Sequence, residues 1–152
     1  MARCLWVMAA LLTSVLVVCA ADPAVGVWKL NVKKSKYVPG PAPKEQTRTY
    51  IEQKGGVRGT VRTVFTTGKE TIVIYPVDYD GKEHPVEGSP DMDGIAMARV
   101  TEYISESKLI HAGVVIGLAR RTVNPDGKSM IISYEGILQG VKVNNTAYYE
   151  RQ

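Results

Sequence analysis

The chain has 152 residues, and its 19 Lys and Arg against 15 Asp and Glu give a formal net charge of +4. This charge is mild and scattered, apart from a short basic run at 33–36, and no aromatic residues are interleaved with it in a nucleic-acid-binding motif. The composition therefore excludes a DNA- or RNA-binding protein, and the length suits one core in a single domain.

Residues 1–21 have the pattern of a secretory signal peptide. Arg3 supplies positive charge, residues 5–18 are almost entirely apolar, and Cys19-Ala20-Ala21 offers small residues for cleavage. The apolar run is shorter than the ~20 residues that a membrane-spanning helix needs, and Asp22-Pro23 ends it. We expect a signal helix that is removed on export. Residues 22–152 then form one secreted or periplasmic domain without a transmembrane span.

The only two cysteines, Cys4 and Cys19, both lie in that first segment. The exported domain therefore has no disulfide, no cysteine nucleophile and no thiolate metal site. A second possibility is lipidation of Cys19, because Leu16-Val17-Val18-Cys19 resembles a bacterial lipoprotein box, although Val18 stands where such boxes have a small residue. Lipidation would anchor the domain to a membrane without changing its fold.

From Trp28 onward the sequence alternates between apolar and polar residues with a period of two, which is typical of β-strands. A proline-rich loop follows the first strand, and Asp80-Gly81 predicts a two-residue hairpin turn between the strands on either side. Pro76 marks an edge or a bulge. The expected strands are residues 28–31, 46–53, 57–65, 70–79, 82–86, 95–105, 108–116, 118–123, 130–138 and 141–151.

These short strands follow one another with no amphipathic helix between them. Sequential antiparallel strands without covering helices must roll up or stack to bury one face. We therefore predict an all-β fold, a single antiparallel up-and-down β-barrel of roughly 8–10 strands.

The two ends of the predicted barrel resemble the calycin group, which comprises the lipocalins and the fatty-acid-binding proteins. The similar residues are Gly26-Val27-Trp28-Lys29-Leu30 and a last strand that ends Tyr148-Tyr149-Glu150-Arg151. The resemblance implies that Gly26 and Trp28 close one end and that Arg151, or by another register Arg120-Arg121, packs over the indole. A fatty-acid site is not carried over, because Ala147 stands where a carboxylate-binding arginine would fall. Residues 28–43 also resemble uncharacterised exported proteins of soil bacteria.

Strand alternation points several aromatic side chains inward together with small residues such as Gly59, Ala98 and Gly136. Such a barrel holds either a ligand cavity or a filled core, and the sequence leaves both open. Arg62, Arg99 and Arg120 are further candidates, as interior anchors for an anion. The predicted ligand-binding residues are Tyr50, Phe65, Tyr75, Arg99, His111, Arg120, Tyr134 and Tyr149.

The sequence contains no recognisable catalytic motif and predicts neither a metal site nor a cofactor. Its two histidines, His84 and His111, lie on different predicted strands, and Asp91-Met92-Asp93-Gly94 lacks the glutamate of a calcium loop. The leading hypothesis is an exported monomer that binds a small lipophilic or amphipathic molecule. The alternatives are an enzyme with a barrel cavity, such as an isomerase or hydrolase, and a structural envelope protein with a filled core.

Overall fold

The structure is a computed structural model that describes residues 21–152, and these residues form strands and one short 3₁₀ helix. The predicted signal helix lies outside the described residues. In chain order the elements are β1 (Gly26–Leu30), η1 (Val32–Lys34), β2 (Lys36–Val38), β3 (Glu45–Gln53), β4 (Gly56–Val64), β5 (Glu70–Val77), β6 (Asp80–Pro85), β7 (Gly94–Arg99), β8 (Ile104–His111), β9 (Val114–Val123), β10 (Ser129–Leu138) and β11 (Val141–Arg151).

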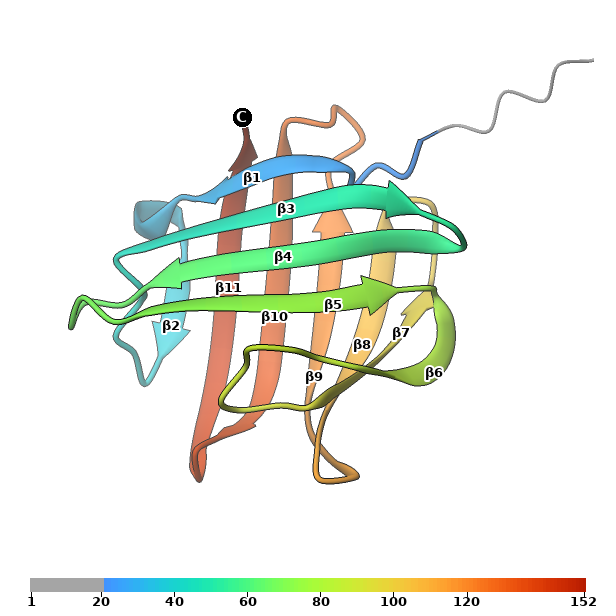
Figure 1. Cartoon of the computed structure of the whole chain (residues 1–152). Helices are drawn as coiled ribbons and strands as arrows, with labels where there is room; N and C mark the ends of the chain where they lie inside the picture. The colour runs from blue at the N-terminus through green and yellow to red at the C-terminus, as the bar shows by residue number, and fades with distance from the viewer. Residues whose placement is uncertain (1–20) are drawn as a thin grey trace, which may run out of the picture.

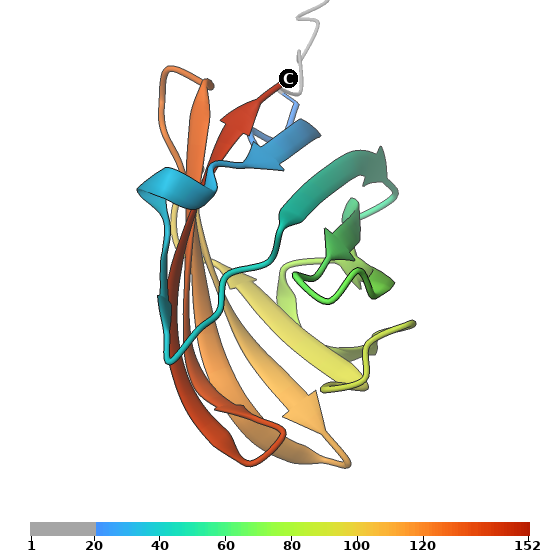
Figure 2. The ribbon, with the colours of Figure 1, turned by 90° about the vertical axis from the view of Figure 1, so that its left-hand side faces the viewer.

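The strands form one antiparallel sheet in the order β5-β4-β3-β1-β11-β10-β9-β8-β7-β6, and β2 pairs with β11 beside this path. Strands β1 and β3–β5 run across the long strands β8–β11, and the two groups face each other (Figures 1 and 2). The two ends of the sheet meet where Ile74 of β5 exchanges backbone hydrogen bonds of 3.0 and 2.9 Å with Glu87. The fold is therefore a nearly closed antiparallel β-barrel, as the alternating pattern predicts.

The hairpin predicted at Asp80-Gly81 is wrong. Both residues belong to β6, which pairs with β7, while β5 pairs with β4 at the opposite edge of the sheet. The chain turns at Asp78 and Tyr79, where Tyr79 has a positive φ of 55°. Asp80-Gly81 is a frequent turn sequence, but here it begins the strand that closes the barrel.

Two other strand boundaries also differ from the prediction. The expected strand 95–105 is divided by a turn between β7 and β8, and β9 runs unbroken through Gly117. The hairpin between β8 and β9 turns at Ala112 and Gly113, whose φ values of 48° and 76° fit a type I′ turn. Glycine is common in such a turn but alanine is not, so only Gly113 marks the turn in the sequence.

One end of the barrel is densely packed. Trp28, Tyr149, Met130 and Val57 are fully buried there. Along the inner face of β10 burial then decreases, from Met130 at 0% exposure to half-buried Ile132 and Tyr134. On β11 the same change runs from Tyr149 to half-buried Asn145. The barrel is closed to solvent at the Trp28 end, which we call the packed end, and becomes accessible to solvent toward the opposite end, which we call the less packed end.

The guanidinium of Arg151 lies over the Trp28 ring, 4.2 Å from its centroid. Its nitrogens donate hydrogen bonds to the carbonyl oxygens of Pro23, Val25 and Gly127 at 2.8, 2.6 and 2.5 Å. The Trp28 indole donates a bond of 2.8 Å to the Ala24 carbonyl oxygen. A cation over an indole contributes about 0.5–2 kcal/mol. This arrangement fastens residues 22–25 across the packed end.

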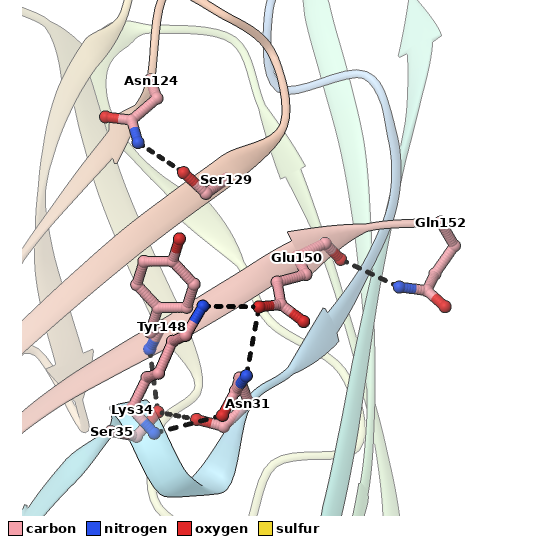
Figure 3. A network of polar contacts seen from close by, with 8 residues as sticks. All are labelled: Asn31, Lys34, Ser35, Asn124, Ser129, Tyr148, Glu150 and Gln152. Atoms are coloured by element: carbon pink, nitrogen blue, oxygen red, sulfur yellow. Dashed lines mark hydrogen bonds and ion pairs between the residues drawn. The ribbon is translucent and has the colours of Figure 1, made fainter.

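A second polar network fixes η1 to the outside of β11 (Figure 3). The Glu150 carboxylate accepts from the Lys34 ammonium at 2.9 Å and from the Asn31 amide at 3.1 Å, and the Tyr148 backbone N–H donates to Ser35 Oγ at 2.9 Å. A shallow surface hollow of about 430 Å³ lies beside it. The charged groups of the network, Lys34 and Glu150, are exposed, so each contact stabilises the fold by at most about 1 kcal/mol. We interpret this network as a structural clasp.

Candidate functional site

The most distinctive chemistry of the molecule is a group of arginine and tyrosine side chains inside the barrel, which we call the interior cluster: Arg48 and Tyr50 of β3, Tyr75 of β5, Arg121 of β9 and Tyr149 of β11. Strand alternation places them all on the inner face. The register brings Tyr50 and Tyr75 to either side of Gly59 of β4. A side chain at Gly59 would collide with both rings, since a Cβ there would lie 2.8 Å from Tyr75 and 3.0 Å from Tyr50. Glycine therefore allows the two hydroxyls to meet at 3.1 Å.

Arg48 is held from several sides by uncharged groups. Its Nε donates to the Tyr149 hydroxyl at 2.9 Å, and its Nη1 makes a long contact of 3.4 Å to the Tyr75 hydroxyl. Tyr149 in turn donates to the Gln46 side-chain oxygen, and the Gln46 amide donates to Thr63 at 2.8 Å. The guanidinium is thus oriented by a chain of neutral side chains.

Arg121 is 6% exposed and enters the same region from the opposite side. Its guanidinium lies 4.9 Å from the centre of the Tyr50 ring, and its Nη2 donates to the Tyr79 hydroxyl. Tyr79 donates to Asp22 Oδ2 at 2.7 Å, and Arg99 donates to the same oxygen at 2.5 Å. The relay Arg121–Tyr79–Asp22–Arg99 therefore connects the interior cluster with a surface hollow of about 460 Å³ beside Tyr79.

The environment of the interior cluster changes the proton affinities of its members. Burial alone would raise the pKa of Tyr50, but the positive charges of Arg48 and Arg121 outweigh burial and lower it to about 8. Burial and the neighbouring Tyr50 raise the pKa of Tyr75 far above its ordinary value. The pKa of Arg121 also rises, because its interaction with the tyrosines outweighs burial. Both arginines are therefore charged at any physiological pH.

Three buried side-chain atoms on the inner face have no hydrogen-bond partner: Ser105 Oγ of β8, Arg121 Nη1 of β9 and Tyr134 Oη of β10. They lie on three consecutive strands. Ser105 is directly opposite Arg121, and Tyr134 follows two residues after Ile132, which is the Arg121 partner on β10. The Tyr134 hydroxyl extends away from Arg121, toward Gly117 and Gly136. Buried polar atoms are nearly always satisfied, so these unsatisfied groups mark a face where additional polar atoms would be stabilised.

Comparison with known proteins does not assign a family. Neither the protein-family models nor the curated proteins include a match to this chain. No helix among residues 21–152 has the length and apolar character required to cross a membrane. Within the same residues, no three side chains of the His, Asp and Glu type come together as metal ligands would.

The structure brings together half of the predicted ligand-binding residues. Tyr50, Tyr75 and Tyr149 belong to the interior cluster, and Arg99 joins it through Asp22. Tyr134 lies on the inner face but nearer the less packed end.

The remaining three predicted residues lie outside the cluster. Phe65 directly follows β4 and is 39% exposed, and His111 is exposed beside Asp93. Arg120 points outward and pairs with Glu106 at 2.5 Å. The other histidine, His84, lies between Asp78 and Asp80 on β6, two strands away from His111.

Sequence reasoning missed Arg48, Arg121, Tyr79 and Asp22. For Arg48 the signal was present, because it alternates with Tyr50, which was expected to point inward. For Arg121 the signal was incomplete, because alternation requires one side chain of Arg120-Arg121 to point inward but does not say which. Tyr79 and Asp22 lie outside regular strands, so no periodicity could identify them.

Proposed function

We propose that this protein is an exported carrier or receptor that binds a small, partly apolar molecule against the inner face of β8–β10. The observation that carries the proposal is the set of unpartnered polar atoms on this face, Ser105 Oγ and Arg121 Nη1 at one level and Tyr134 Oη further along the strands. A bound molecule with oxygen atoms would satisfy donors that otherwise lose their hydration without compensation.

The surroundings of these atoms suit a partly apolar ligand. Ala119 and Ile132 lie on the same inner face, and the half-buried side chains of β10 show that solvent reaches this part of the interior. Apolar surface with a few polar groups is typical of small-molecule sites. The barrel would thus bind the polar end of the ligand deep inside and its apolar part nearer the less packed end.

Two finer points belong to the same proposal. The contact of Arg151 with the buried Trp28 supports a calycin-like barrel. The charge and apolar pattern of residues 1–21 supports export to the periplasm or the medium, with cleavage before Asp22 and a monomeric mature form. The alternative is a lipid-anchored protein in which processing leaves a lipidated Cys19 as the first residue.

The test begins with protein isolated from the exported fraction of an expressing cell. Its intact mass identifies the first residue, and organic extraction with mass spectrometry identifies any co-purified molecule. Binding is then followed by the fluorescence of Trp28, which is the only tryptophan of residues 22–152, across a panel of lipophilic and amphipathic compounds.

A matched pair of variants locates the site. Ala119→Phe fills the inner face beside Tyr134, whereas Leu118→Phe enlarges the next side chain of the same strand, which is 59% exposed. We expect the first variant to lose binding and the second to keep it. An empty extract together with unchanged fluorescence for every compound would refute the proposed function.

A further inference from the structure

The interior of this barrel has an excess of positive charge. Arg48 and Arg121 lie inside, and the one carboxylate of their hydrogen-bonded network, Asp22, pairs directly with the exposed Arg99 at 2.5 Å. Within residues 21–152, neither Arg48 nor Arg121 forms an ion pair with a carboxylate. A buried charge without a counter-charge is costly and is normally paired.

The two unpaired arginines approach the same place from facing strands. Arg121 lies 4.9 Å from the centre of the Tyr50 ring, and Arg48 contacts Tyr75, whose hydroxyl is 3.1 Å from that of Tyr50. Arg121 Nη1 is buried and has no partner, so it has N–H groups to donate. The Tyr50–Tyr75 pair adds one further O–H donor at the same point, because the other proton is used in the hydrogen bond between the two hydroxyls. Arginine N–H groups bind planar oxyanions especially well, because two of them match two carboxylate oxygens.

Asp22 is hydrogen-bonded to Arg121 only through Tyr79, and the group beside both arginines that can become negative is Tyr50. With its pKa lowered to about 8, Tyr50 is still mostly protonated at neutral pH. Tyr75 and Tyr149 hold their protons more strongly than ordinary tyrosines, mainly because they are buried. With the tyrosines protonated and Asp22 paired with Arg99, an anion from outside the chain would be stabilised between Arg48 and Arg121.

We infer that the ligand is an organic acid whose carboxylate is bound by Arg48 and Arg121, with its apolar body directed along β9 and β10. This inference rests on the proposed function and adds the chemical class of the ligand. The unpartnered Tyr134 hydroxyl lies further along β10 and would contact the body of the acid.

Matched ligands separate the charge from the apolar body. Naphthoic acid and naphthamide share one body, and dodecanoic acid and dodecanol share another. Calorimetry at pH 7 should show each acid binding at least about ten-fold more tightly than its neutral partner, because hydrogen bonds between charged groups are roughly twice as strong as those between neutral groups.

The decisive variants are two adjacent arginines. Arg121→Gln removes the interior charge, whereas Arg120→Gln removes an outward charge that pairs with Glu106. We expect Arg121→Gln to bind the acid no more tightly than the neutral compound. Arg120→Gln should still bind the acid more tightly than the neutral compound. If Arg121→Gln does not fold, Arg48→Gln and Arg121→Lys replace it in the comparison with Arg120→Gln. Arg121→Lys keeps a positive charge and should therefore keep part of the preference for the acid over the neutral compound.

The outcomes distinguish this inference from the proposed function. Equal binding of acid and neutral partner overturns the organic-acid assignment while the binding function stands. If Arg120→Gln loses as much acid affinity as Arg121→Gln, the organic-acid assignment is overturned as well. The loss would then follow the net charge of the protein and not the interior site. Absence of binding by all four compounds, together with an empty extract, overturns both.

Discussion

At the scale of single residues, the interior cluster shows how two fixed charges control one phenol. Tyr50 is 2% exposed, a position where burial alone would keep its hydroxyl protonated. Arg48 and Arg121 reverse that tendency, and the hydrogen bond with Tyr75 acts in the same direction. The pair Tyr50–Tyr75 therefore releases its first proton easily and its second with difficulty.

This arrangement predicts a pH dependence of stability. The pKa of Tyr50 is about 8 in the folded protein and 10 in an unfolded chain, so its ionisation contributes stability that is complete above pH 10 and lost as pH falls through 8. Since one pKa unit corresponds to about 1.4 kcal/mol, the stability of the wild type should rise by about 1–3 kcal/mol relative to Tyr50→Phe over this interval. Urea denaturation at several pH values measures the difference.

Ultraviolet absorbance gives an independent check, because phenolate absorbs at longer wavelength than phenol. One tyrosine should ionise near pH 8 in the wild type, and this step should move upward in Arg121→Gln. If no tyrosine ionises below about pH 10, the two arginines do not act on Tyr50 as described.

The residues of the site also show what a sequence can and cannot determine. Alternation along β3 placed Tyr50 on the inner face, and the same alternation includes Arg48. In Arg120-Arg121 one side chain must point outward, but the sequence does not say which. The outward Arg120 pairs with Glu106 across the β8–β9 pair, a contact that forms only after folding.

At the scale of elements, the strands could be predicted from the sequence. The contact that closes the barrel, where Ile74 of β5 pairs with Glu87, could not, and we call this contact the seam. Hairpin partners close in sequence, such as β10 and β11, follow from alternation and the Gln139-Gly140 turn. The seam joins Ile74 to Glu87 by backbone hydrogen bonds alone, which involve no particular side chain. Sequence patterns therefore predicted the strands but placed a hairpin at Asp80-Gly81, inside the strand beside the seam.

The seam depends on a glycine next to it. Gly88 has a φ of +77°, and a Cβ there would lie 2.0 Å from the Ile72 carbonyl oxygen. Gly81 has a similar φ of +70°, but a Cβ there would meet nothing within 4 Å. The two positions share the conformational strain of a left-handed residue and differ only in the collision with β5.

Gly88→Ala should therefore destabilise the barrel by about 1–3 kcal/mol more than Gly81→Ala, whose cost should be about 1–2 kcal/mol. Chemical denaturation of the two variants measures the difference, and hydrogen exchange at Ile74 and Glu87 shows whether the seam opens. Equal stabilities would mean that the seam contributes little to the barrel.

At the scale of the whole molecule, residues 22–25 connect distant parts of the chain. Asp22 contacts Tyr79 and Arg99, while Arg151 holds the carbonyl groups of Pro23 and Val25. The same few residues thus touch the strands on both sides of the barrel and cover its packed end. Through Tyr79 they also orient Arg121, so closure of the barrel and geometry of the candidate site are linked.

Asp22 provides the test of this link. Burial raises its pKa, but hydrogen bonds from Tyr79, the Ala24 N–H and Arg99 outweigh burial and lower it below 3.8. Its ionised form thus contributes stability that is complete above the ordinary pKa and lost as pH falls through the lowered value. Asp22→Asn should cost about 1–3 kcal/mol at pH 7, and this difference should shrink in acid below pH 3.8.

Glu106→Gln is the matched control for that variant. Both carboxylates lie 2.5 Å from an arginine nitrogen, but the Asp22 side chain is 12% exposed and that of Glu106 is 53% exposed. The exposed pair should contribute less than about 1 kcal/mol. Because Asp22 also orients Arg121 through Tyr79, Asp22→Asn should weaken organic-acid binding while Glu106→Gln should not. A loss of stability without a loss of binding would show that the packed end and the site are independent.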